Sequence, residues 1–345
     1  MRNANAIRLL IRLACFLPFA GALLLVNWIG GQHLVRRRFT APLDAAAEAL
    51  VAGKTIVAHI DTLDLKPIWI EHLRCQSEVI VLGSSRVVQI RHEWFGPRTM
   101  LNLSLLAGDF ADAVSLFQKY LDTGKTPKLV LLELNPTLTF EERTRPTPAL
   151  APYYRRTLLR YGIFSPDLLS GPLTLDAFRW NPVIFLGRHP WKVSDAMEPG
   201  ASRIRPDGSA DWSDIEAPET ADQVERDVRS RIHSLDPQYQ HWRMTSRPDW
   251  FSRKLLEGFL DDLHARGIRV VVLLVPLHPT AYDFYSRQGG YDDSWIRHEM
   301  AQRGIAVVGT YSPSAAKATR DDFYDDVHAH PAVLHRLLAE GGIVE

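Results

Sequence analysis

The sequence predicts an α/β domain built on a mostly parallel, five-stranded sheet with helices on both faces. Two observations support this prediction. Short, continuous apolar runs rich in β-branched residues recur along the chain, as is typical of strands buried on both faces. Segments with helical spacing of apolar residues stand between these runs, and this alternation is typical of parallel sheets. The predicted strands are 79–82, 99–103, 128–134, 268–275 and 305–308.

The helices are predicted from apolar residues that recur every three or four positions. In the first of them, Phe110, Val114, Phe117 and Leu121 would lie on one face. Pro331 stands at an early position of the last helix, where proline is tolerated because the first N–H groups of a helix are unpaired. The predicted helices of the domain are 110–121, 250–265, 295–302 and 331–338.

The N-terminal segment has the features of a membrane anchor. Residues 13–29 carry no charge and are mostly apolar, which is close to the minimum length for a bilayer span. Arginines flank this stretch on both sides, and Trp28 lies where an interfacial aromatic residue is expected. We expect an uncleaved single-pass anchor over 1–33 in the inner (cytoplasmic) membrane, and the arginines on its two flanks favour an inside N-terminus only slightly. A cleaved signal peptide and a buried helix are the alternatives.

Two stretches fall outside the strand–helix alternation. Residues 34–77 are predicted to form a connector that includes a short amphipathic helix at 41–52. Residues 136–248 are rich in Pro, Arg, Trp and Tyr and contain few long apolar runs. We therefore expect them to be an insertion or lid within a domain that spans 78–345, with a turn at 206–208.

The charge of the chain argues against one class of partner. The 345 residues include 40 Lys and Arg against 40 Asp and Glu, so the formal charge balances. A nucleic-acid-binding protein would usually show a basic excess, and no nucleic-acid partner is expected.

The residues that could perform chemistry follow the predicted strands, at the edge where parallel sheets bind ligands. Gly83 allows a tight turn from strand to helix, and Ser85 would then lie at the start of a helix, which favours developing negative charge. Near the C-terminus, Asp325 precedes His328 by three residues. Together these residues supply the nucleophile, base and orienting acid of acyl transfer. Helix capping is the alternative explanation for both segments.

Four further residues are candidates for the same site. Gly108 can bring its N–H close to a ligand, and the Asn135 side chain can donate, so both could form an oxyanion hole. Asn135 precedes a proline and could instead begin a turn. Arg86 could bind an anionic substrate group or lie in solvent, and His278 could line the site at the end of the fourth strand.

A metal site is the less favoured alternative near the C-terminus. His328 and His330, with nearby carboxylates, are possible ligands, but no third ligand group stands out. We expect neither a metal nor a cofactor.

The order of Gly83-Ser84-Ser85, Gly108, Asn135 and Asp325-x-x-His328 resembles that of the SGNH (GDSL-type) hydrolase superfamily, over residues 78–135 and 268–338. The resemblance implies a three-layer α/β/α, flavodoxin-like fold without a cofactor. It implies that Ser85 is the nucleophile, His328 the base and Asp325 its partner. It also implies an oxyanion hole formed by the serine and glycine backbone and the asparagine side chain.

The match departs from the family pattern at two places. Ser84 stands where many members have Asp, and Glu133-Leu134-Asn135-Pro136 lacks the usual Gly-x-Asn-Asp. The Gly-Ser-Ser variant and the expected anchor look like the membrane-anchored branch, which resembles teichoic-acid D-alanyl transfer and alginate O-acetylation proteins. This implies that the catalytic domain is extracytoplasmic (periplasmic) and transfers acyl groups on a polysaccharide or glycopolymer there, with a multi-pass membrane acyltransferase as a possible partner. A stand-alone esterase or lipase and a non-catalytic scaffold are the alternatives.

Overall fold

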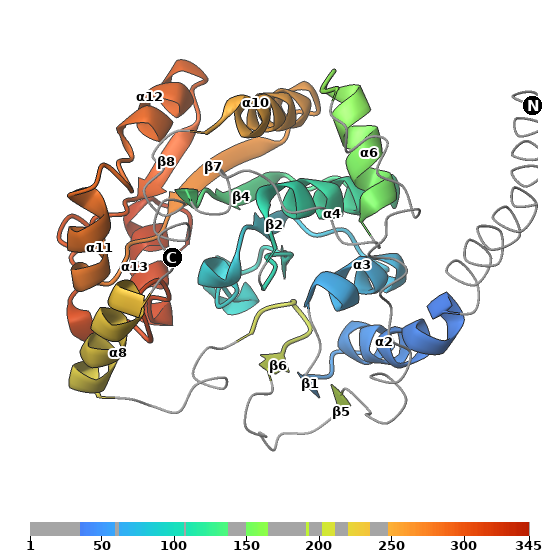
Figure 1. Cartoon of the computed structure of the whole chain (residues 1–345). Helices are drawn as coiled ribbons and strands as arrows, with labels where there is room; N and C mark the ends of the chain where they lie inside the picture. The colour runs from blue at the N-terminus through green and yellow to red at the C-terminus, as the bar shows by residue number, and fades with distance from the viewer. Residues whose placement is uncertain are drawn as a thin grey trace, which may run out of the picture.

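Figure 1 shows the computed structural model of the chain. It describes residues 35–58, 62–106, 108–136, 150–164, 191–192, 202–210, 220–234 and 248–344. The membrane anchor expected at 1–33 lies outside this part of the chain. Across the described ranges, none of the helices combines the length and the apolar character needed to span a bilayer.

The centre of the domain is a five-stranded sheet in which all neighbouring strands run parallel, as the sequence predicted (Figure 1). Its strands are β2 (Val79–Leu82), β3 (Met100–Asn102), β4 (Leu129–Glu133), β7 (Arg269–Leu274) and β8 (Ala306–Gly309). Across the sheet they follow the order β3-β2-β4-β7-β8. The chain therefore reverses direction across the sheet between β2 and β4, and such a switch point is where open parallel sheets bind ligands.

Alternate side chains of β2 enter two different hydrophobic cores, one on each face of the sheet. Ile80 and Leu82 belong to the first core, whereas Val79 and Val81 belong to the second. This follows from the two-residue repeat of a strand and explains why the run is continuously apolar. The first face is covered mainly by α4 (Phe110–Asp122) and α10 (Trp250–Ala265), and the second by α13 (Pro331–Glu340).

The segment expected to be a connector is part of this domain. It forms α2 (Val35–Val51), β1 (Ile56–Ala58) and α3 (Thr62–His72), and α3 packs against both α2 and α4. Lys66 is buried, and its Nζ donates to the main-chain carbonyls of Asn102 at 2.8 Å and Ser104 at 2.6 Å. These hydrogen bonds tie α3 to the end of β3.

The described parts of the expected insertion also pack on the domain. They form α6 (Ala151–Arg160), β5 (Trp191–Lys192), β6 (Ser202–Ile204) and α8 (Ala221–Ser234), and β5 and β6 flank β1 in a small antiparallel sheet. The predicted turn is present, because Gly208 N–H donates to the Arg205 carbonyl at 2.8 Å. The Asp207 carbonyl accepts from Asn102 N–H at 2.7 Å, which joins this turn to the edge of the sheet.

A single-turn η3 (His92–Phe95) lies between β2 and β3, and three further elements connect β7, β8 and α13. They are α11 (Pro279–Ser286), α12 (Ser294–Gln302) and the single-turn η7 (Arg320–Asp322). Buried side chains of α11 and α12 join the first core, whereas Ala316, Ala318, Phe323 and Ala329, between β8 and α13, join the second. The loop between η7 and α13 carries the candidate base and acid of the sequence analysis.

Candidate active site

The candidate nucleophile lies on a sharp turn directly after β2. Gly83 has a φ of +154°, and a Cβ at this position would lie 2.6 Å from the Cβ of Glu133. Only glycine therefore fits the turn. Ser85 begins η2 (Ser85–Val87), a single 3-10 turn, and not the longer helix that the sequence suggested. The helix dipole expected beside Ser85 is consequently absent from this turn.

The loop before α13 holds the candidate acid against the candidate base. Tyr324 N–H donates to the His328 carbonyl at 2.9 Å, which closes a tight loop. Within it, Asp325 Oδ1 accepts from the backbone N–H groups of Val327 and His328, both at 2.8 Å. These two hydrogen bonds fix one carboxylate oxygen and leave Oδ2 directed at the imidazole.

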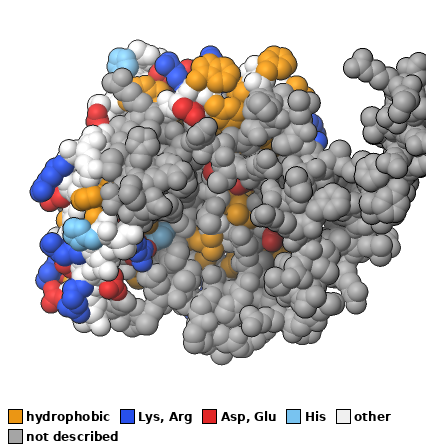
Figure 2. Space-filling view, viewed as in Figure 1, with side chains coloured by type: hydrophobic (Ala, Val, Ile, Leu, Met, Phe, Trp, Pro, Cys, Tyr) orange, Lys and Arg blue, Asp and Glu red, His pale blue; other side chains and the backbone are white. Residues whose placement is uncertain are grey.

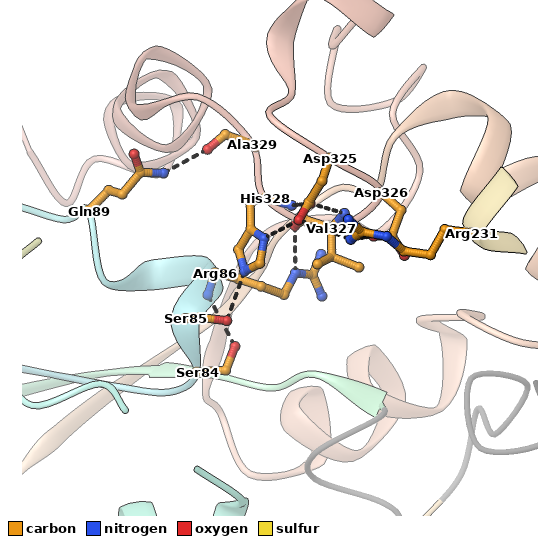
Figure 3. Close-up of polar contacts among 10 residues, drawn as sticks. All are labelled: Ser84, Ser85, Arg86, Gln89, Arg231, Asp325, Asp326, Val327, His328 and Ala329. Carbon is orange, nitrogen blue, oxygen red and sulfur yellow. Dashed lines mark hydrogen bonds and ion pairs between the residues drawn. The ribbon is translucent and has the colours of Figure 1, made fainter. Parts of the chain in front are cut away.

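The structure brings the three candidate residues into one hydrogen-bonded chain (Figure 3). Ser85 Oγ lies 2.8 Å from His328 Nε2, across 243 positions of sequence. On the other side of the ring, His328 Nδ1 lies 2.8 Å from Asp325 Oδ2. With the Nδ1 proton donated to the carboxylate, Nε2 can accept the proton of the serine hydroxyl. His328 and Asp325 are both buried.

The environment of Asp325 favours its ionised form. Burial opposes ionisation, but the charge and hydrogen bond of His328 and the backbone N–H groups of Val327 and His328 outweigh it. The net effect holds the pKa of Asp325 well below its usual range. The carboxylate is therefore available at neutral pH to orient the imidazole and to stabilise its protonated form.

Arg86 lies inside the domain, where only 1% of its surface is exposed. Its Nε donates to the Val327 carbonyl at 3.1 Å, and its Nη2 donates to the carbonyls of Pro276, at 3.1 Å, and Val275. All three acceptors belong to the protein backbone. This placement fits a tie between the serine turn and the histidine loop, and not the expected contact with an anionic substrate group.

Glu133 is the buried counterion of this region. Its Oε1 lies 3.9 Å from Arg86 Nε, and its Oε2 accepts from Ser84 N–H at 2.6 Å and Ser84 Oγ at 2.7 Å. Ser84 Oγ in turn accepts from Arg86 N–H at 3.3 Å. Ser84 and Glu133, two of the positions that depart from the family pattern, thus contact each other and hold the turn that presents Ser85.

Gly108 and Asn135 both lie beside the serine turn, at the switch point of the sheet. They line one small cavity that is open to solvent, together with Gly83, Ser84, Asp109, Phe110, Ala113, Leu132 and Glu133. A Cβ on Gly108 would lie 2.5 Å from the Cβ of Leu105, so the close approach of this loop requires glycine. Both expected oxyanion donors are therefore placed at the same edge as the candidate nucleophile.

His278 does not line this cavity. Its side chain is fully buried at the N-cap of α11, where Nδ1 accepts from Thr280 N–H at 3.3 Å. Its backbone N–H donates to the Asp326 carbonyl at 3.1 Å, which braces the loop before His328 from behind. The sequence correctly put His278 at the end of a strand, but its side chain caps α11, its backbone N–H contacts the loop, and it is not among the residues that line the cavity.

Arg231 is a residue of this site that the sequence analysis missed. It comes from α8 in the expected insertion, and its Nη1 lies 3.0 Å from Asp326 Oδ1 and 3.4 Å from Asp325 Oδ2 (Figure 3). Arg231 and Asp325 are 94 positions apart, and no motif surrounds the arginine. Only the packing of α8 reveals this contact.

The described ranges contain no group of three His, Cys, Asp or Glu side chains suited to a metal ion. His328 contacts Ser85 and Asp325 through its two ring nitrogens, so the hydrogen bonds of this ring are already assigned. His330 packs its ring against Tyr324, with the ring centroids 4.2 Å apart. The two histidine rings therefore contact different groups.

No protein-family model matches this chain, and no curated protein matches it. The structure establishes an α/β domain on a five-stranded parallel sheet. The resemblance to a particular superfamily rests on the residues and the geometry described above.

Proposed function

We propose that this chain is a serine-dependent acyl-transfer enzyme of the SGNH type, acting through an acyl-serine intermediate. One observation carries the proposal: the continuous hydrogen-bonded chain from Ser85 Oγ through His328 to Asp325. A serine with such a base and orienting acid is the recurring arrangement of acyl transfer on unrelated folds. The strand order, which matches the flavodoxin-like order of doubly wound sheets, supports the family resemblance.

In the first half-reaction, Ser85 Oγ attacks the carbonyl carbon of an ester and its proton passes to His328 Nε2. The negative charge that develops on the carbonyl oxygen requires nearby donors, and we propose the Gly108 backbone N–H and the Asn135 side chain, which line the cavity beside Ser84. When the bond to the leaving alcohol breaks, His328 returns the proton to that oxygen. The product is an acyl ester on Ser85, and Asp325 stabilises the imidazolium between these steps.

In the second half-reaction, a hydroxyl of the acceptor gives its proton to His328 Nε2 and attacks the acyl carbon. Ser85 leaves and recovers its proton from the same nitrogen. Water as acceptor makes the enzyme an esterase, and a sugar hydroxyl makes it an O-acyltransferase. We propose that the acceptor is a polysaccharide or glycopolymer outside the cytoplasm. We also propose that the chain is anchored in the inner membrane and receives its acyl group from a multi-pass membrane acyltransferase.

The test is covalent labelling of the full-length protein in detergent by a fluorophosphonate probe. We expect the wild type to be labelled at Ser85, and Ser85→Ala and His328→Ala to be unlabelled although folded. Ser314→Ala, which removes an exposed serine of the same chain, serves as the matched control and should label normally. A folded wild type that takes up no probe would contradict the proposal and favour a scaffold.

A second measurement separates transfer from hydrolysis. The protein is given a p-nitrophenyl ester, and release of p-nitrophenol is followed with and without an added oligosaccharide acceptor. We expect the acceptor to accelerate release and to become acylated, because it competes with water for the acyl-serine. Equal release with no acylated sugar would identify a stand-alone esterase.

A further inference from the structure

The candidate acid has a charged neighbour from a distant part of the chain. Arg231 Nη1 contacts two consecutive carboxylates, Asp326 Oδ1 at 3.0 Å and Asp325 Oδ2 at 3.4 Å. Asp325 Oδ2 is the oxygen that also lies 2.8 Å from His328 Nδ1. Arg231 Nη1 and His328 Nδ1 therefore contact the same carboxylate oxygen of Asp325.

Arg231 lies beside two adjacent carboxylates of this loop. The side chain of Asp326 is 1% exposed and that of Asp325 is 9% exposed, so two adjacent carboxylates lie away from water. Like charges so close repel each other in a poorly solvated site, and a cation between them offsets this cost. Other charged or titratable groups near the loop, within the described residues, include His328 itself, Arg86 from the serine turn, Glu225 and Arg229 from α8 and His278 from the start of α11.

Several contacts hold α8 in place independently of Arg231. Val224, Val228 and Ile232 recur every four residues and are buried against the first core. At the start of the helix, Asp222 pairs with Arg320 of η7 at 2.9 Å. Glu225 accepts from the Thr280 hydroxyl of α11 at 2.9 Å. At the lower left of Figure 2, where Figure 1 places α8, side chains of both charge signs are interspersed.

We propose that Arg231 is a positioning residue of the active site, through which the insertion helix α8 makes the Asp325–His328 pair competent. This inference rests on the proposed function. The positive charge of Arg231 offsets the negative charge of Asp326. The negative charge of Asp325 then interacts mainly with the imidazole of His328. A catalytic domain without a docked α8 would keep Ser85 and His328 but lose this balance.

The first experiment measures the fluorophosphonate labelling rate of the full-length Arg231→Met protein, separating the maximal rate from the half-saturating probe concentration. We expect the maximal rate to fall by about tenfold or more, in the range of coupling between contacting residues, with little change in half-saturation. Arg231→Lys keeps the positive charge and should label at a rate near that of the wild type. Arg226→Met, on the exposed side of the same helix, is the matched control and should label like the wild type.

The second experiment tests the charge argument. Removal of Arg231 takes a positive charge away from Asp325 and Asp326 and makes the surroundings of the imidazole more negative, which disfavours loss of its proton. The pH at which Arg231→Met labels at half its plateau rate should therefore move upward. Adding Asp326→Asn to Arg231→Met removes the extra charge, and we expect it to restore much of the rate and return the pH profile toward that of the wild type.

The outcomes are distinct. If the wild type is folded but unlabelled, the proposed function fails and this inference fails with it. If the wild type is labelled and Arg231→Met labels equally fast with an unmoved pH profile, the proposed function stands and this inference is overturned. A slow Arg231→Met that Asp326→Asn does not restore also overturns it. Should Arg231→Met fail to fold, Arg231→Lys and the double variant serve as the test. The proposal expects Arg231→Lys to label at nearly the wild-type rate and the double variant to keep much of that rate. Slow labelling of either variant in its folded form overturns it.

Discussion

Arg86 Nε donates to the main-chain carbonyl of Val327, the residue before His328, at 3.1 Å. On the other side of the histidine, Gln89 Nε2 donates to the Ala329 carbonyl at 2.9 Å (Figure 3). Both donors come from the segment after β2 that carries Ser85, and both acceptors flank His328 directly. The distance between the candidate nucleophile and base is therefore set by backbone contacts on both sides, and not by their own hydrogen bond alone.

The buried pair of Arg86 and Glu133 gives the first prediction. In Arg86→Met, Glu133 keeps a buried charge without its counterion, so the free energy of unfolding should fall by about 3–5 kcal/mol. Probe labelling should also slow, because the loop bearing His328 loses its tie to Val327. Arg74→Met, at an exposed arginine, is the control for denaturant unfolding and labelling. An equal free energy of unfolding for the two variants would show that the contact between Arg86 and Glu133 does not stabilise the fold.

Gly83 gives the second prediction, because its turn presents Ser85. In Gly83→Ala the new Cβ would lie 2.6 Å from atoms of Glu133, so the turn must shift and labelling of Ser85 should be lost. Gly124→Ala is the matched control, since Gly124 also has a positive φ, +79°, but faces open space. Its backbone strain alone should cost about 1–2 kcal/mol of stability and leave labelling intact. Labelling in Gly83→Ala at the wild-type rate would contradict this account of the turn.

The sheet could be predicted because its signals are local. The run at β2 is apolar at every position, and Ile80 and Val81 enter opposite cores. Such a run needs no information from distant residues to be recognised. The placement of Ser85, Gly108 and Asn135 at one edge then follows from parallel topology, since each residue comes shortly after a strand.

The rest depends on contacts between distant segments, which carry no local signal. The sequence around Arg86 fits a solvated residue as well as a buried one, and only the carbonyls of Val275, Pro276 and Val327 decide between them. Arg231 is similar, because its role depends on where α8 docks. Residues 34–77 were predicted to be a connector because they fall outside the strand–helix alternation, and nothing local to Lys66 signals that its side chain is buried.

Asn135 gives the third prediction. If its amide donates to the oxyanion, Asn135→Ala should lower kcat for p-nitrophenyl ester hydrolysis by about 100- to 1000-fold. KM should change little, because the donor acts on charge that exists only in the transition state. Thermal unfolding of the same preparation checks that the fold is intact. A raised KM with an unchanged kcat would instead make Asn135 a substrate-binding residue of the cavity.

The fourth prediction concerns the pH dependence of stability and comes from Lys66. Burial lowers the pKa of this amine to about 7, with the carboxylate of Asp207 opposing the shift. In the unfolded chain a lysine has a pKa of about 10.4, so between these two pH values the unfolded state binds more protons than the folded one. The free energy of unfolding should therefore rise as pH increases from 7 to 9, relative to a protein that lacks this group.

Denaturant unfolding of the wild type, Lys66→Met and Lys54→Met at pH 7, 8 and 9 measures this effect. Lys54 is an exposed lysine and controls for the loss of one amine. Wild type and Lys54→Met should gain stability with pH in parallel, whereas Lys66→Met should gain less. Lys66→Met should also be the least stable of the three, because the carbonyls of Asn102 and Ser104 lose their donor. Three parallel pH profiles would mean that Lys66 titrates alike in the folded and unfolded chains, and that α3 is held to β3 without a buried, neutral amine.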